Sequence, residues 1–252
     1  YNLTVTTIPD DDHNPVTKEV TITVNKVNST LTVNDIVFDY GSSGSTVVSL
    51  TGADGVNATV VGQPKAVVKV NGTNITVSDL DAGTYTLTVT TIADKNHNNI
   101  TKNATITVNK VNGTLTVNDV VLDYGESKNI TVTTEGATGI TAKIDGVNVT
   151  VSNYTIPISG LSAGNYTLTV TTIADKNHNP VTKEANINVN KVESTLTVGD
   201  IVFDYGSEGS GDVSFTGASE VIANVVNQPS AVVSVNDNKI KQFKIETKGY
   251  NV

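Results

Sequence analysis

The chain has 252 residues and a formal net charge of −9, it contains no Cys, Met or Trp, and all 16 of its basic residues are Lys. These absences exclude disulfide bonds, thiolate metal sites and cysteine nucleophiles, and an acidic chain without Arg does not favour nucleic acid as a partner. No apolar run approaches the roughly 20 residues of a membrane span. Val (40), Thr (39) and Asn (29) dominate the composition, and the β-branched bias favours strands.

The sequence repeats with a period of just over eighty residues. Residues 1–41 match residues 166–206 at 32 of 41 positions, and a third version of the same motif fills residues 85–125. Four tyrosines open the copies at intervals of 84, 81 and 84 residues, namely Tyr1, Tyr85, Tyr166 and Tyr250. A unit of this length fits one small domain per repeat rather than one turn of a solenoid. The middle copy is shorter between Asp123 and Asp145 than its neighbours are at the same place, which indicates an A–B–A order.

Alternating apolar and Thr residues predict strands within each copy. Within residues 85–92, Tyr85, Leu87 and Val89 fall on one face and Thr86, Thr88 and Thr90 on the other, and residues 104–108 and 115–117 alternate in the same way. This period of two is typical of a sheet with one face in a core and one in water. Asn71-Gly72 and Asp145-Gly146 separate alternating runs, so we expect each pair to form a two-residue hairpin turn with positive φ angles.

A Leu-x-Ala-Gly-x-Tyr segment precedes each central strand, at residues 80–85 and 161–166. A tyrosine that opens a strand after such a corner buries its ring and returns its hydroxyl to nearby backbone, as in the tyrosine corner of immunoglobulin-like sandwiches. About seven short strands per copy suit the same fold. We therefore predict an all-β chain of tandem immunoglobulin-like (Ig-like) β-sandwiches, with Tyr1, Tyr85, Tyr166 and Tyr250 as structural corner residues.

The corner, an LTVT strand, a D-x-N-H-N tip and a closing TITVNKV strand resemble bacterial Ig-like repeats of the group 3 type. The Asn-Lys-Val joints and the abundant Asn-x-Thr sites are most similar to adhesin-like surface proteins of methanogenic archaea. The resemblance implies an extracellular Ig-like array and identifies no ligand. One departure is the histidine at the tip (His13, His97 and His178), and another is the altered corner at residues 245–250.

The Asn-Lys-Val joints predict the domain boundaries. Residues 27–110 and 111–191 are two whole Ig-like domains, of type A and type B. Residues 1–26 are expected to be the C-terminal hairpin of a preceding or neighbouring-chain domain, and residues 192–252 a type A domain that lacks its last two strands. Two interpretations remain: a stretch of a longer tandem array, or head-to-tail assembly in which residues 1–26 of one molecule complete the last domain of the next by strand addition.

Candidate sites for chemistry are few. The tip Asp10-Asp11-Asp12 offers oxygen ligands that Ca²⁺ would accept, but turn-favouring residues explain it as well, so no metal and no cofactor is expected. Asn-x-Ser/Thr sequons are the candidate attachment sites for N-linked glycans. They number twelve, at Asn2, Asn28, Asn57, Asn71, Asn74, Asn99, Asn103, Asn112, Asn129, Asn148, Asn153 and Asn165.

The repeats and the resemblance thus predict a non-enzymatic extracellular structural protein, a repeat segment of a cell-surface stalk or filament. No nucleophile–base pair stands out, and the three histidines are spaced by whole domains. Its expected partners are copies of itself, head-to-tail or lateral. The alternative is an adhesin module that binds a glycan or protein on a cell or host surface through its loops.

Overall fold

The computed structural model describes residues 1–204, 207–226, 232–236 and 239–243. All regular structure in these ranges consists of β-strands. The chain divides into two compact units, residues 1–118 with 129–157 and 167–185, and residues 119–128 with 158–166 and 186–252. The predicted corner at Tyr250 lies outside the described residues.

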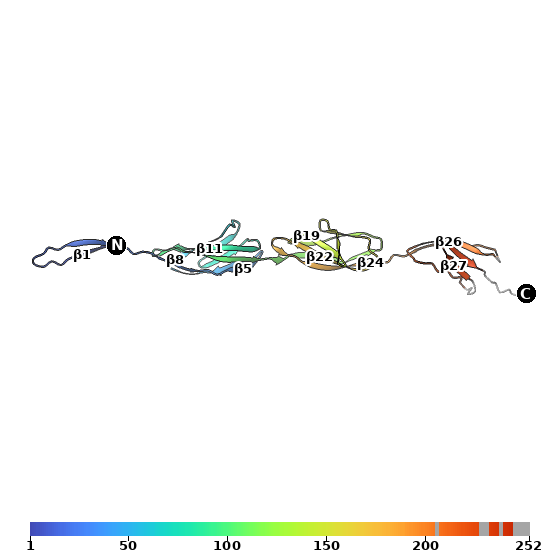
Figure 1. Ribbon diagram of the computed structural model, residues 1–252, viewed down its shortest axis with the longest axis horizontal. Coiled ribbons are helices and arrows are strands. Elements are labelled where there is room, and N and C mark those ends of the chain that lie inside the picture. The colour runs from blue at the N-terminus through green and yellow to red at the C-terminus, as the bar shows by residue number, and fades with distance from the viewer. Residues whose placement is uncertain (205–206, 227–231, 237–238, 244–252) are drawn as a thin grey trace. The chain divides into compact units, whose positions relative to one another are not determined.

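The N-terminal segment is a lone hairpin of β1 (Asn2–Thr6) and β2 (Thr17–Thr21), shown in dark blue in Figure 1. The two strands pair antiparallel from Asn2↔Thr21 to Thr6↔Thr17. Every side chain of the two strands is exposed.

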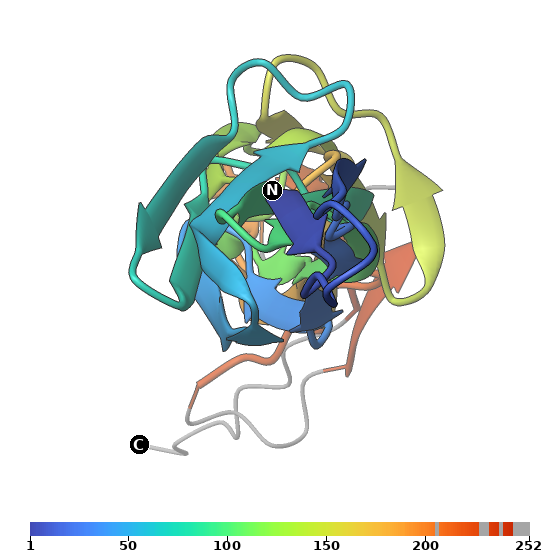
Figure 2. The same cartoon turned by 90° about the vertical axis from the view of Figure 1, so that its left-hand side faces the viewer.

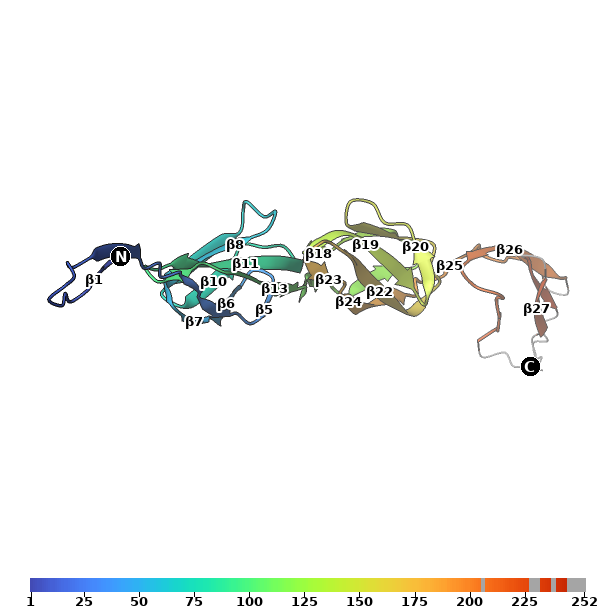
Figure 3. The same cartoon turned by 60° about the vertical axis from the view of Figure 1, so that its left-hand side comes forward.

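The first sandwich, residues 27–109, contains eleven strands. They are β3 (Val27–Asn28), β4 (Thr30–Thr32), β5 (Ile36–Asp39), β6 (Ser43–Val47), β7 (Ser49–Thr51), β8 (Ala53–Val60), β9 (Val67–Asn71), β10 (Asn74–Ser78), β11 (Gly83–Ala93), β12 (His97–Asn98) and β13 (Thr101–Asn109). One sheet has the order β5-β13-β11-β8 and the other β6-β10-β9 (Figure 3), with the short pairs β4-β7 and β12-β3 beside them. Two mostly antiparallel sheets packed face to face form an Ig-like sandwich.

The core of the first sandwich consists of the inward-facing residues of both sheets. Ile75 from β10, and Leu87, Val89 and Ile106 from β11 and β13, are all 0% exposed. Burying one such side chain contributes about 1.5–3 kcal/mol. The alternation predicted for residues 85–90 and 104–108 therefore places its apolar face in this core, and Phe38 from β5, 7% exposed, packs in the same core.

The second sandwich, residues 111–190, repeats this plan with one strand exchanged. Its strands are β14 (Val111–Asn112), β15 (Thr114–Thr116), β16 (Val120–Asp123), β17 (Lys128–Thr131), β18 (Thr133–Glu135), β19 (Ala137–Ile144), β20 (Val147–Val149), β21 (Thr155–Ile158), β22 (Gly164–Ala174), β23 (His178–Asn179) and β24 (Thr182–Asn190). The larger sheet has the order β16-β24-β22-β19-β20, beside the pairs β17-β21, β15-β18 and β14-β23. The strand after the Asp145-Gly146 turn thus extends the larger sheet, whereas β9 belongs to the smaller sheet.

The third copy is described in part, by β25 (Thr195–Val198), β26 (Gly209–Thr216), β27 (Val232–Asn236) and β28 (Lys239–Phe243) in the order β25-β26-β28-β27. Val213 is buried, but Leu196 is 59% exposed, whereas its counterpart Leu31 in the first sandwich is 6% exposed. The described chain is thus all-β, with Ig-like sandwiches in tandem, as predicted. The predicted domain limits stay a prediction.

One of the two predicted hairpin turns is wrong by one residue. Asp145 (φ 45°) and Gly146 (φ 84°) form the expected turn with two positive φ angles. In the first sandwich, however, Asn71 pairs with Asn74, so the turn residues are Gly72 and Thr73. The observed register sets Ile75 opposite Val70 and Val77 opposite Val68. A turn at Asn71-Gly72 would set Val77 opposite Ala66 instead, so the larger Val–Val contact favours the observed register over the turn preference of Asn-Gly.

Candidate functional site

The best-organised polar cluster is the tip between β11 and β13. The Asp94 carboxylate accepts hydrogen bonds from the backbone N–H groups of Asn96 (2.7 Å) and His97 (2.6 Å), and the His97 Nδ1 atom lies 2.9 Å from Asp94 Oδ1. Burial raises the pKa of the Asp94 carboxyl, but the hydrogen bonds from the His97 ring and the two backbone N–H groups outweigh this effect, so its pKa is lowered from 3.8. The tip is therefore a closed, charged turn.

The second sandwich repeats this cluster almost unchanged. Asp175 accepts the backbone N–H groups of Asn177 and His178, both at 2.7 Å, and the His178 Nδ1 atom lies 2.9 Å away. Burial raises the pKa of Asp175 and the same kinds of hydrogen bond, with the His178 ring foremost, lower it below 3.8. Two sandwiches of different type thus keep one tip geometry.

In each of the two sandwiches the ring of the tip histidine, His97 or His178, lies against a glycine. A Cβ atom built on Gly52 would lie 2.5 Å from the His97 ring, and one on Gly136 would lie 2.3 Å from the His178 ring. Both glycines have positive φ angles, +68° and +73°, so backbone conformation and space both select glycine there. This contact was not predicted from the sequence, although a glycine recurs in each copy at the corresponding place, including Gly217 in the third.

The tip also holds the segment by which the chain enters the sandwich. Val27 and Asn28 pair in parallel with His97 and Asn98, and Lys26 Nζ donates to the Asp94 carbonyl at 2.9 Å. In the second sandwich Lys110 Nζ donates to the Asp175 carbonyl at the same distance. The Lys of the Asn-Lys-Val joint therefore acts as an anchor for the entering strand.

The tip of the N-terminal hairpin lacks this support. His13 Nδ1 lies 2.6 Å from Asp10 Oδ1, and Asp10 also accepts the Asp12 backbone N–H at 3.0 Å. The hydrogen bond from the His13 side chain is the main cause that lowers the pKa of Asp10 from 3.8. Asp10, Asp11 and Asp12 are exposed. Across the described ranges no three His, Asp or Glu side chains converge as a metal site.

The corner tyrosines return their hydroxyls to the chain. Tyr85 Oη donates to the Asp81 carbonyl at 2.9 Å, and Tyr166 Oη donates to the Ser162 carbonyl at 2.8 Å. Both rings are half-buried, whereas Tyr1 is 83% exposed.

All twelve sequon asparagines are exposed, the position that a glycan requires. They occur in each part of the chain up to Asn165. Some of their amide oxygens already accept a hydrogen bond: Asn103 accepts one from the Thr88 hydroxyl at 3.1 Å, and Asn28 one from Asn98 at 3.4 Å. Because a glycan attaches to the amide nitrogen, these contacts do not occupy the atom to be modified.

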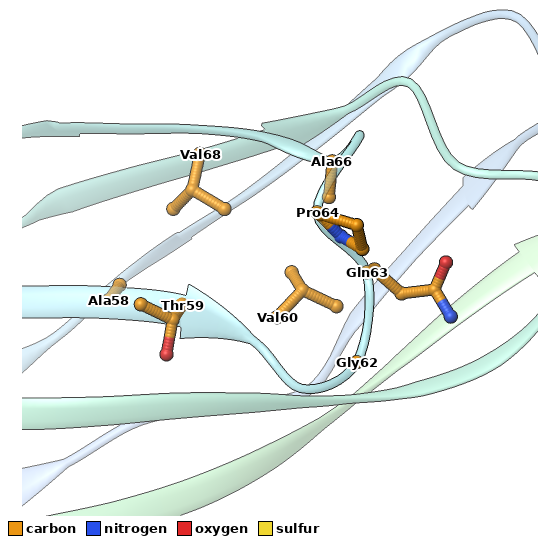
Figure 4. Close-up of a pocket in the computed structure, with 8 residues that line it drawn as sticks. All are labelled: Ala58, Thr59, Val60, Gly62, Gln63, Pro64, Ala66 and Val68. Carbon is orange, nitrogen blue, oxygen red and sulfur yellow. The ribbon is translucent and has the colours of Figure 1, made fainter.

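An open hollow of about 510 Å³ lies beside the loop between β8 and β9 in the first sandwich. Figure 4 shows that its lining is neutral, with small aliphatic side chains and the polar groups of Thr59 and Gln63. The loop, cyan in Figure 2, stands clear of the strands that it connects. The second sandwich has no counterpart of this loop, because β19 turns directly into β20 at Asp145-Gly146.

In the part of the chain that the structure describes, no helix is long and apolar enough to cross a membrane. No family model matches the sequence, and no curated protein matches it. Among solved structures, it is similar to a three-Ig fragment of titin, with 9% identity and a TM-score of 0.39 over 88% of this chain and 90% of that one.

It is also similar to the tandem Ig repeats of Dlar, with 11% identity and a TM-score of 0.27 over 65% of this chain and 98% of that one. The fibronectin(III)-like modules of Clostridium thermocellum CbhA give 15% identity and a TM-score of 0.28 over 64% and 95%. At these values the likenesses carry no argument about function. The fold assignment rests on the sheets themselves.

Proposed function

We propose that this chain is a non-enzymatic extracellular structural protein, a repeat segment of a stalk or filament on an archaeal cell surface, whose sandwiches bear tension along the chain. One observation carries the proposal. In each complete sandwich, a strand near the point of entry pairs in parallel with the strand at the exit.

The parallel pair recurs in detail. In the first sandwich β5 and β13 pair from Ile36↔Ile106 to Asp39↔Asn109, and Asn109 Nδ2 donates to Asp39 Oδ1 at 3.1 Å. In the second sandwich β16 pairs with β24 in the same way. There Asn190 Nδ2 donates to Asp123 Oδ1 at 3.0 Å.

This geometry determines how a pull acts on the sandwich. The chain enters β5 at its amino end and leaves β13 at its carboxyl end, which are opposite ends of a parallel pair. Opposed forces slide such strands along each other, so the ladder hydrogen bonds must break together. A hairpin that is pulled at its open end loses them one after another. Because forced unfolding is governed by the rate of crossing the barrier, loading in shear favours long survival under tension.

Single-molecule force spectroscopy on the full chain tests this proposal. The chain has no Cys, so paired cysteines supply unique handles. One variant carries Val27→Cys and Asn109→Cys, which loads β5 and β13 in shear. The control carries Val67→Cys and Ser78→Cys, which are partners at the open end of the β9–β10 hairpin. We expect rupture at clearly higher force in the first variant. Equal forces would contradict the mechanical role.

We further propose that the face of the N-terminal hairpin packs in a sandwich contributed by a second copy, which gives head-to-tail assembly by strand addition. Leu3, Val20 and Ile22 are 44%, 48% and 44% exposed, whereas their counterparts Leu87, Ala104 and Ile106 are 0%, 7% and 0% exposed. The apolar face of the hairpin thus has the side-chain pattern of a core. In the third copy Leu196 is 59% exposed, whereas its counterpart Leu31 is 6% exposed, which supports the proposal.

Sedimentation velocity at increasing protein concentration tests the assembly. Strand addition predicts chains of copies that Leu3→Asp abolishes, because this side chain lies on the apolar face. Thr4→Asp on the opposite face is the matched control and should leave assembly intact. A monomer at every concentration would contradict strand addition between copies.

A second function, an adhesin module, is favoured by the hollow beside the loop of residues 61–66. Its neutral lining with Thr59 and Gln63 suits a sugar or a short uncharged peptide segment. Binding of the full chain to a glycan array, lost in Gln63→Ala and kept in Asn148→Ala, an exposed amide in the second sandwich, would support this function. Absence of any binding would leave the structural role alone.

A further inference from the structure

The end of the first sandwich forms a polar contact with the tip at residues 175–178. Both regions belong to the same compact unit. Lys176 Nζ donates to Asp81 Oδ2 at 2.7 Å, and Asn177 Nδ2 donates to Asp81 Oδ1 at 3.0 Å. Asn177 Oδ1 in turn accepts the Ala82 backbone N–H at 2.8 Å. The Asp81 carboxylate and the Ala82 N–H thus form hydrogen bonds with two consecutive side chains of the tip, Lys176 and Asn177.

An aromatic contact between Tyr40 and His178 adds to these hydrogen bonds. The ring of Tyr40 meets the ring of His178 edge to face, with centroids 5.5 Å apart and planes at 78°. Tyr40, Asp79 and Asp81 also line a hollow of about 240 Å³ at this end of the sandwich. The hydrogen bond from Lys176 is the main cause that lowers the pKa of Asp81 from 3.8, and the same bond raises the pKa of Lys176 above 10.5. The contact therefore favours the ionised carboxylate of Asp81 and the protonated amine of Lys176.

The other copies differ at the positions that make this contact. Ser162 stands in the second sandwich where Asp81 stands in the first, and Asp11 stands in the N-terminal tip where Lys176 stands in the second. An acidic tip would set Asp11 against Asp81, which like charges disfavour. The same tip against Ser162 meets no such charge. The first sandwich's own tip has Lys95 and Asn96 and matches the Lys-Asn type.

We propose that the surface formed by Tyr40, Asp81 and Ala82 is a selective docking site for the Lys-Asn-His tip of the copy that follows it, and that it rejects an acidic tip. The residue at the Asp81 position of one copy and the residue at the Lys176 position of the next then determine whether the two copies can form this contact. This inference stands apart from tension bearing, because it concerns the order of the copies and not their strength. It also explains why the tips vary at two positions while the Asp and His that close them do not.

Hydrogen exchange of the Ala82 amide, followed by NMR on the full chain, tests the proposal, because this proton is the one that Asn177 holds. Lys176→Asp with Asn177→Asp, which gives this tip the acidic sequence of residues 10–13, should speed exchange at Ala82 about fivefold to tenfold. Lys95→Asp with Asn96→Asp changes the other tip in the same way and should leave Ala82 unchanged. Protection at Leu87 and Ile106 reports that the first sandwich remains folded.

A charge reversal separates selection from simple contact. Lys176→Asp alone should speed exchange at Ala82, and Asp81→Lys added to it should restore protection, because the pair is then opposite in charge again. Restoration together with loss of the effect at high salt supports the proposal, since salt screens an exposed pair. Unchanged exchange in Lys176→Asp, or no restoration in the double variant, would overturn it.

Discussion

The contact between tip histidine and glycine offers the sharpest test of how each sandwich closes. Gly52→Ala places a methyl group where the His97 ring lies, 2.5 Å away, on a residue with a φ angle of +68°. Gly41→Ala is the matched control, because Gly41 has a φ angle of +80° but no atom within 4 Å of a built Cβ. The two variants share the backbone strain and differ only in the clash.

The magnitudes follow from these two terms. A positive φ costs an L-residue about 1–2 kcal/mol, so Gly41→Ala should lose about that much free energy of unfolding. Overpacking against a held ring adds about 1–3 kcal/mol, which brings Gly52→Ala to about 2–5 kcal/mol. The Gly52→Ala/His97→Ala variant, compared with His97→Ala alone, should lose only the strain term.

Native-state hydrogen exchange is the appropriate assay, because it reports the stability of each sandwich separately. Amides of Leu87 and Ile106 report the first sandwich, and those of Leu168 and Ile187 serve as an internal reference. Each ~1.4 kcal/mol is a tenfold change in exchange rate. If Gly52→Ala costs no more than Gly41→Ala, or if removing His97 brings no relief, the packing of ring on glycine is refuted.

Three further predictions concern the core, the tip and the surface. Ile106→Ala should cost about 2–5 kcal/mol, since Ile106 is 0% exposed, whereas Ile22→Ala at the same place in the hairpin, 44% exposed, should cost far less in a monomer; equal losses by hydrogen exchange would show that the hairpin is packed. The pKa values of Asp94 and Asp175 are lowered on folding. Their contribution to the free energy of unfolding is therefore present above the unfolded-state pKa of about 4, and it is lost as the pH falls through the lower folded-state pKa. NMR should therefore show both tips opening in acid, and Asp94→Asn should remove this dependence from the first tip only; tips that stay closed in acid would refute it. Glycopeptide mass spectrometry of native material should find glycans on some of the twelve sequon asparagines, and finding none would reject glycosylation.

The strands could be predicted because each copy repeats a local pattern. Alternating Thr and aliphatic residues define which face of residues 85–90 is buried. The pattern ends at Thr91, which is 2% exposed with its hydroxyl hydrogen-bonded to Ser29, while Ile92 is 41% exposed. The turn at Gly72 could not be placed to the residue, because the register depends on which valines meet Ile75 and Val77 across the hairpin. Local turn preference and cross-strand pairing compete there, and pairing prevails.

The contacts of the tips could not be predicted from the sequence for a different reason. Gly52 and His97 are 45 positions apart and Asp81 and Lys176 are 95 apart, so no local pattern links them. Their recurrence in register was visible: a glycine and a tip histidine in each complete copy, and Asp81 replaced by Ser162. Only the fold shows that these positions touch. The exchange of β20 to the larger sheet is likewise a consequence of loop length that strand periodicity does not reveal.

The central claim is that this chain builds a load-bearing filament on a cell surface. Electron microscopy of the native source, with antibodies against the β8–β9 loop of residues 61–66, tests it most directly. The account predicts label at regular intervals along thin surface filaments. Label confined to compact particles, or absent from every surface structure, would contradict it.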